Sequence, residues 1–182
     1  MGTEGLLNSE VPGAVVRSFS MQGSSFNRIH DAGARAYSYR LYDKLMGRPE
    51  RVASPKPEEV LCSLLDPFDV EDLVFVYLQV VRGLLVLPGS RRTDTAAYEY
   101  VLVDREGKEQ TIVQVKTGDS AVDLEQLRSA AGETHRAIAY STSGAYAGSA
   151  PEVEKLTNKQ LLEFMATHPK ILPPRARAWL GR

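Results

Sequence analysis

The chain has a single cysteine, Cys62, and therefore cannot form an internal disulfide bond. Its longest apolar runs are far shorter than a membrane-spanning helix, and its first residues lack the basic and apolar pattern of a secretion signal. Together these absences predict a soluble cytoplasmic protein that has no membrane partner.

The sequence also lacks a strong net charge. Its formal net charge is −1 over 182 residues, so no overall basic field attracts the protein to nucleic acid, and such binding would need a local patch. Hydrophobic residues make up 43% of the chain and charged residues 25%, which is typical of a globular domain. The length predicts one domain with an accessory segment.

The first third of the chain differs from the rest. Residues 1–24 show no sustained periodicity and are expected to be a loose arm, and a locally basic helix is expected from about Ala34 to Met46. We therefore divide the chain into an N-terminal arm and helical extension (1–56) and a core with a basic C-terminal tail (57–182). Trp179 is the expected anchor of this tail.

The core is predicted to alternate helices and strands. The clearest element is an amphipathic helix over 70–82, with Asp69 as its N-cap. The other expected elements are a short helix over 57–65, strands over 84–87, 98–103, 111–116, 136–140 and 153–156, a helix over 121–131 capped by Asp119 or Ser120, and a helix over 159–167 capped by Asn158. A hairpin followed by a helical crossover implies a mixed sheet with helices on both faces.

The central hairpin carries an unusual set of polar side chains. Gln114 and Lys116 project to the same face of their strand because side chains alternate, and Glu99 lies on the preceding strand. Metal-assisted cleavage of a phosphodiester needs acidic oxygens to hold the cation and a positive group to steady the attacking water. Further candidate acids are Asp94, before the hairpin, and Glu71, in the first turn of the amphipathic helix.

Simpler interpretations of these residues stay open. The run Val-Gln-Val-Lys is also typical of a half-exposed strand, and Glu99 could form an ordinary cross-strand ion pair with Lys116 that contributes little stability. Glu71 could be a favourable charge at the start of a helix.

Four segments carry a resemblance to a known family. They are EDLVFVYLQVVRGLLVLPGS, YEYVLVDREGKEQTIVQVK, AIAYSTSG and VEKLTNKQLLEFM. In this order they resemble the PD-(D/E)xK nuclease superfamily, in particular the Mrr-like restriction endonucleases with a Q-x-K variant of the motif. The resemblance covers about residues 70–167 and is carried by the order and spacing of short motifs.

The resemblance implies a restriction-endonuclease-like mixed β-sheet flanked by helices. It implies an endonuclease that hydrolyses DNA with Mg²⁺ or Mn²⁺, with RNA not excluded, in restriction or defence against foreign DNA. Lys116 would act on the water, Glu99, Asp94 and Gln114 would hold the metal, and Glu71 would be an auxiliary acid. Cutting both strands would favour a homodimer or a larger complex, for which the N-terminal segment is available.

Two further groups are expected to touch nucleic acid, although a solvated helix face and a polar turn are the alternatives. They are Arg28, Arg35 and Arg40 in the basic segment, and Ser141, Thr142 and Ser143 in a polar loop. The rival function is a non-catalytic nuclease-like module that binds nucleic acid or a protein, which Gln114 in place of the motif acid favours.

Overall fold

Five strands form one mixed sheet in the computed structural model, which describes residues 10–19, 29–87, 90 and 97–181. The strands are β1 (Leu85–Val86), β2 (Tyr100–Val103), β3 (Gln110–Lys116), β5 (His135–Ser141) and β7 (Glu154–Leu156), in the order β1-β2-β3-β5-β7. The first three are antiparallel neighbours, whereas β5 runs parallel to β3 and β7 runs parallel to β5. The predicted mixed sheet is therefore confirmed.

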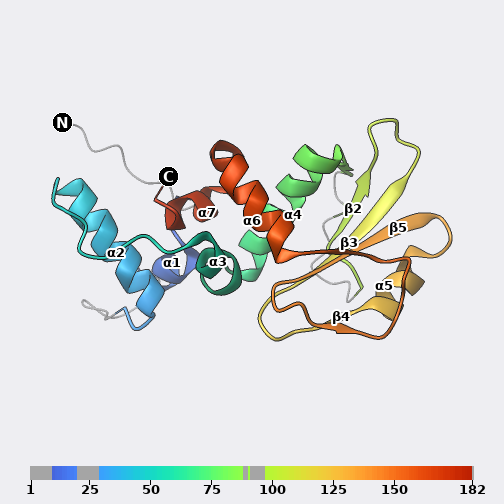
Figure 1. The fold of residues 1–182 in the computed structure, drawn as a ribbon, viewed down its shortest axis with the longest axis horizontal. Coiled ribbons are helices and arrows are strands. Elements are labelled where there is room, and N and C mark those ends of the chain that lie inside the picture. Colours follow the sequence, from blue (N-terminus) through green and yellow to red (C-terminus); the bar gives the residue numbers. More distant parts are fainter. Residues whose placement is uncertain (1–9, 20–28, 88–89, 91–96, 182) are drawn as a thin grey trace.

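Helices cover both faces of this sheet, as predicted (Figure 1). One face packs against α4 (Pro67–Arg82) and α6 (Asn158–Thr167), and it contributes Val113 and Val115 to the larger apolar core. The other face packs against α5 (Leu124–Ala131) and contributes Ile112 to a second, smaller core. This division follows from the alternation of side chains along β3.

The amphipathic helix begins earlier than its apolar pattern predicts. Asp66, not Asp69, is the N-cap of α4 and accepts a hydrogen bond from the backbone N–H of Asp69. Pro67 occupies the first turn, where a missing N–H costs nothing. At the other end, Gly83 closes the helix in the left-handed conformation (φ 67°), as the sequence predicts.

Two other predicted caps are also shifted. A short strand, β4 (Val122–Asp123), pairs with β6 (Tyr146–Ala147) where helix was expected, and Asp123 rather than Asp119 or Ser120 caps α5. Thr157 rather than Asn158 caps α6 through a capping box with Gln160. In each case another polar residue, one to four positions away in the sequence, makes the hydrogen bond.

The described part of the N-terminal third forms helices that pack on the rest of the molecule. Within residues 10–19, α1 (Gly13–Phe19) buries Val15 in the larger core, which corrects the prediction of a loose arm there. The predicted basic helix is confirmed as α2 (Ala32–Leu45), capped by Asp31. The short predicted helix over 57–65 is α3 (Pro57–Glu59) continued by the π-helical turn η2 (Val60–Leu64).

The C-terminal tail folds back onto these helices through η3 (Pro169–Ile171) and α7 (Pro174–Trp179). Trp179 is fully buried and packs edge-on against Tyr37 of α2, with ring centroids 5.6 Å apart, so its predicted anchoring role is confirmed. Figure 1 shows α1, α2, α3 and α7 at one end of the molecule, the sheet at the other, and α4 and α6 between them.

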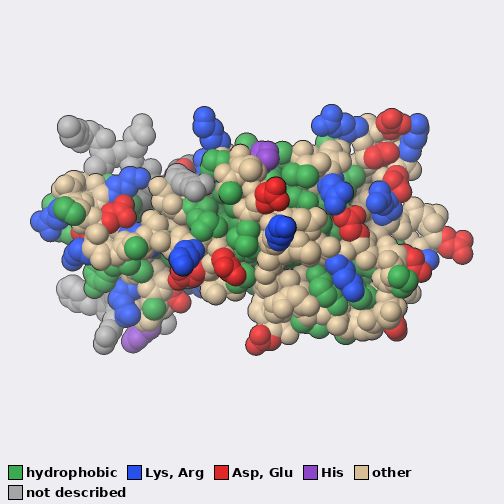
Figure 2. Space-filling model, viewed as in Figure 1, with side chains coloured by type: hydrophobic (Ala, Val, Ile, Leu, Met, Phe, Trp, Pro, Cys, Tyr) green, Lys and Arg blue, Asp and Glu red, His purple; other side chains and the backbone are tan. Residues whose placement is uncertain are grey.

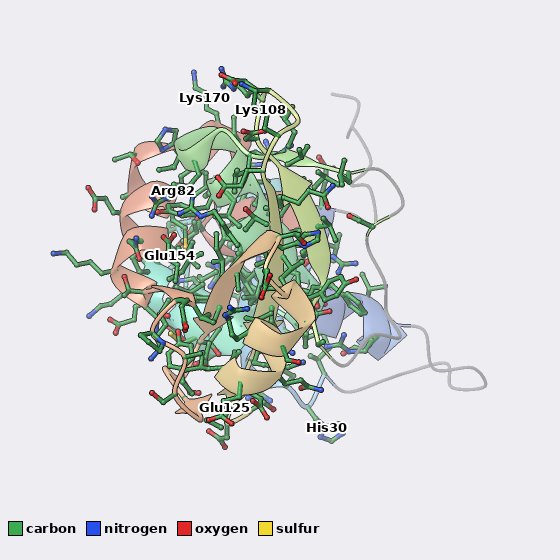
Figure 3. The ribbon with its side chains drawn as sticks, turned by 90° about the vertical axis from the view of Figure 1, so that its right-hand side faces the viewer. His30, Arg82, Lys108, Glu125, Glu154 and Lys170 are labelled. Atoms are coloured by element: carbon green, nitrogen blue, oxygen red, sulfur yellow. The ribbon has the colours of Figure 1, made fainter. Side chains whose placement is uncertain are left out.

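An ion pair joins the end of α4 to the sheet. Arg82 Nη2 lies 2.6 Å from Glu154 Oε1 on β7, and the two side chains are neighbours in Figure 3. Among the helices in the described ranges, none has the length and apolar character needed to span a membrane.

Candidate active site at one edge of the sheet

The direction of the strands brings the ends of the central hairpin together. Parallel strands β3, β5 and β7 finish at the same edge of the sheet, and β2 begins there because it is antiparallel to β3. Tyr100 pairs with Val113, and the backbone N–H of Glu99 donates to the Val113 carbonyl at 2.7 Å. Glu99 is therefore held at the start of β2, next to the end of β3.

Glu99 and Lys116 meet at this edge. Lys116 Nζ lies 3.5 Å from Glu99 Oε1, and the side chains are 34% and 17% exposed, respectively. Both groups thus project to the same side of the sheet, which is the arrangement that a shared site requires. Their partial exposure leaves them accessible to a ligand.

Gln114 lies deeper on the same face. Its position two residues before Lys116 places both side chains on the side of β3 that faces α5, and Gln114 is only 2% exposed. The Lys116 ammonium and the Glu99 carboxylate therefore lie at the edge, and the Gln114 amide lies inward of them. The hairpin does bring together three of the predicted site residues.

Glu71 has a different neighbour. Its Oε2 accepts a hydrogen bond from the hydroxyl of Tyr100 at 3.3 Å, and the Tyr100 ring stacks on Phe75 of α4 with centroids 5.7 Å apart. These contacts hold the Glu71 carboxylate on the α4 side of the hairpin. Asp94, the remaining candidate acid, lies outside the described residues.

The loop after β5 borders the same edge. Ser141 pairs with Lys116, and the backbone N–H of Thr142 donates to the Lys116 carbonyl at 3.0 Å. Ser141 Oγ is committed to the loop itself, since it accepts from the Ala145 N–H at 3.2 Å and contacts Ser143 Oγ at 3.1 Å. Ser141 and Thr142 are buried, whereas Ser143 is exposed. Of the three predicted contact residues, Ser143 is therefore the accessible one.

Asn158 is a residue of this region whose role the sequence did not show. Its Nδ2 donates to the Thr142 carbonyl at 2.9 Å, and its Oδ1 accepts from the Tyr140 hydroxyl at 2.8 Å. Asn158 thereby fixes the loop after β5 to the start of α6. An asparagine beside a helix cap suggested only a capping role, because the strand that it bridges is distant in sequence.

The predicted basic contacts separate into two kinds. Arg40 is buried and donates to the carbonyl oxygens of Ala53 and Trp179, at 3.2 and 3.4 Å. Burial lowers the pKa of this guanidinium below its ordinary value. The group is held in hydrogen bonds that fix the C-terminal tail, and it does not face solvent. Arg35 lies partly exposed on α2, and Arg28 is outside the described residues.

The fold and the edge define an α/β protein with a partly exposed acid–lysine pair where its parallel strands end. Across the ranges that the structure describes, no group of three or more His, Cys, Asp or Glu side chains is placed to hold a metal ion. No protein-family model matches the chain, and no significantly similar curated protein or solved structure is found. The geometry of this edge is therefore the feature of the molecule that points to a function.

Proposed function

We propose that this protein is a metal-dependent endonuclease of restriction-endonuclease-like fold that hydrolyses DNA phosphodiester bonds. The observation that carries the proposal is the 3.5 Å contact between Lys116 Nζ and Glu99 Oε1, with Gln114 on the same face. A role in restriction or defence against foreign DNA is part of the proposal, because the resembling family has such roles.

The arrangement of the core supports the fold part of the proposal. Helix α4 is followed by β1, β2 and β3, then by α5, β5, β7 and α6, which is the order of elements that the resemblance implies. The strand–turn–strand segment brings its acid and its Gln-x-Lys pair to one edge. Ligands of open α/β sheets commonly bind outside the carboxyl ends of the strands, and this edge is such a place.

The residues at the edge could bind a hard divalent cation with a small number of protein ligands. Mg²⁺ is commonly held by one or two carboxylates together with phosphate oxygens of the substrate, and it retains several waters. Glu99 would supply the carboxylate and Gln114 an amide oxygen. When bound, the metal would supply Lewis-acid stabilisation of charge on the phosphate.

Lys116 has the more direct chemical role. Its ammonium group is within reach of the Glu99 carboxylate, so both would face the same phosphate. A positive group fixed there can orient the attacking water and stabilise the negative charge that develops in the transition state. Because β3 is a central strand with neighbours on both sides, the backbone that carries Lys116 is rigidly positioned.

The test is nicking of supercoiled plasmid DNA with Mg²⁺ or Mn²⁺. We expect wild-type protein to convert the plasmid to open circles, and Lys116→Ala and Glu99→Gln to lose at least about 100-fold in rate. Lys108→Ala is the matched control, because Lys108 forms an exposed ion pair with Glu106 in the turn of the same hairpin. Thermal unfolding of each variant checks that the fold persists.

The outcome also distinguishes the alternative, a non-catalytic module that binds nucleic acid or a protein. That alternative is favoured by Gln114 at the acidic motif position and by the near-neutral net charge of −1. If wild-type protein nicks no DNA with either metal, or if Lys116→Ala cuts as fast as wild type, the nuclease proposal is wrong.

A further inference from the structure

Helix α2 has a second apolar stripe that faces away from the core. Its inner side buries Ala34 and Tyr37 against the C-terminal tail. On its outer side lie side chains spaced four, three and four residues apart, which places them on one face of a helix. We call them the outer stripe: Arg35, Tyr39, Tyr42 and Met46.

The two tyrosines of the outer stripe are unusually accessible. Tyr39 and Tyr42 are each 46% exposed, and Met46 is more exposed still. Figure 2 shows Lys and Arg side chains together with apolar ones over α2, at the left end of the molecule. Exposed aromatic side chains that gather in one place commonly mark a binding surface.

Arginines from the segment after α2 lie over these rings. The Arg51 guanidinium carbon is 5.1 Å from the centre of the Tyr39 ring and 5.9 Å from that of Tyr42, and Arg48 is 5.5 Å from the Tyr42 ring. These distances are within the range of cation–π interactions. The outer stripe and these two arginines thus bring guanidinium groups and aromatic rings together on one surface.

A buried acid fixes this surface in place. Asp43 is 1% exposed, and its two oxygens accept from Arg51 Nε at 3.1 and 3.0 Å, while one also accepts from the Arg51 backbone N–H. The guanidinium is therefore oriented before any ligand arrives, which reduces the entropy lost on binding. Asp43 also neutralises Arg51.

The remaining charge on the surface is positive. Within the described ranges, neither Arg35 nor Arg48 has an acidic partner within ion-pair distance. Arg35 and Arg48 therefore add positive charge beside exposed rings, on a protein whose overall net charge is −1.

We propose that the outer stripe, with Arg48 and Arg51, binds single-stranded nucleic acid. Unpaired bases would stack on the tyrosine rings and guanidinium planes, and Arg35 and Arg48 would contact phosphates. A duplex could interact only with the charged groups, because its bases are already stacked and present no free face to a tyrosine. This inference shares its ligand class with the proposed nuclease function but depends on a different surface.

The test is fluorescence anisotropy with a labelled deoxythymidine 20-mer and with a duplex of the same length, in EDTA so that binding is measured without cleavage. We expect the single strand to bind more tightly, and Tyr39→Ala and Tyr42→Ala each to raise its Kd by about 5-fold or more. Tyr39→Phe and Tyr42→Phe keep the ring and should bind as wild type. Val80→Ala is the control, because Val80 is similarly exposed on α4.

Salt dependence tests the phosphate contacts. Arg48→Gln should reduce the slope of log K against log salt by about 0.7, the value for one contact to a single strand. The inference is overturned if both tyrosine-to-alanine variants bind the 20-mer as tightly as wild type. It is equally overturned if they change only the oligomeric state, which would identify the stripe as a contact between two copies.

The two proposals fail separately. Lys116→Ala should lose plasmid nicking and keep single-strand binding, whereas the tyrosine variants should lose binding in EDTA, where no cleavage occurs. Loss of binding in the tyrosine variants, with no nicking by wild type, would support the inference and refute the nuclease.

Discussion

Asp69 should make the stability of this protein depend on pH in an unusual direction. Its side chain, near the start of α4, is 7% exposed, and Oδ1 lies 3.3 Å from Arg175 Nη1. Burial, followed by the nearby charge of Asp66, raises the pKa of Asp69 from an ordinary value of 3.8 to about 6, although Arg175 opposes this. The carboxylate is therefore less stable here than in the unfolded chain.

The sign follows from proton binding. Between about pH 4 and pH 6 the folded state holds the Asp69 proton and the unfolded state has lost it, so raising the pH lowers the free energy of unfolding. Above about pH 6 the Asp69 carboxyl group is ionised in both states, and the free energy of unfolding falls no further on its account. A shift of about two pKa units corresponds to about 3 kcal/mol.

The perturbation is Asp69→Asn, which imitates the protonated acid at every pH. At pH 8 we expect the variant to be more stable than wild type by up to about 3 kcal/mol, or roughly 6–12 °C in Tm for a chain of this length. At pH 4 the difference should nearly vanish. Urea unfolding at a series of pH values measures it.

Asp119→Asn is the control for this series, since Asp119 is an exposed acid in the loop after β3. The free energy of unfolding of this variant should stay close to that of wild type at every pH in the series. If Asp69→Asn has the same effect at pH 4 and pH 8, or is less stable than wild type at pH 8, the explanation based on burial is refuted.

Three other substitutions test the packing and the caps. Trp179→Ala should lower the free energy of unfolding by about 3–5 kcal/mol in urea titrations, because the ring is fully buried, whereas Ile171→Ala, at an exposed site, should change it little. Thr157→Ala should cost about 1 kcal/mol in the same titration through loss of the α6 capping box. Hydrogen bonds from Arg51 lower the pKa of Asp43, so Asp43→Asn should destabilise the protein at neutral pH. In thermal melts, the difference in Tm between this variant and wild type should shrink as the pH falls through that lowered pKa.

The periodic elements of this fold could be predicted from sequence, and the hydrogen bonds at their ends could not. The apolar spacing of α4 identified its inner face, since Leu73 and Val74 are fully buried, and Gly83 ended it as expected. The predicted start of α4 was wrong because two aspartates, Asp66 and Asp69, both precede apolar residues. Only the tertiary structure shows that Asp69 turns toward Arg175.

The candidate site was predictable to the extent that it is local. Alternation placed Gln114 and Lys116 on one face, and the hairpin brought Glu99 to them. The contact between Glu71 and Tyr100 was not predictable, because it depends on how α4 crosses the sheet. The burial of Arg40 was also missed, since a basic helix pattern does not show which arginine the C-terminal tail will cover.

The position of the acid–lysine pair follows from register and from the cost of burying charge. A shift of β2 by one residue against β3 would turn Glu99 to the α4 face, where Leu102 now packs in the larger core, and would separate it from Lys116. A lone carboxylate in that core would have a large desolvation penalty, whereas at the edge of the sheet both groups keep water. The same requirement that keeps Glu99 and Lys116 hydrated keeps them accessible to a ligand. The hairpin register therefore determines both the stability of this pair and its accessibility.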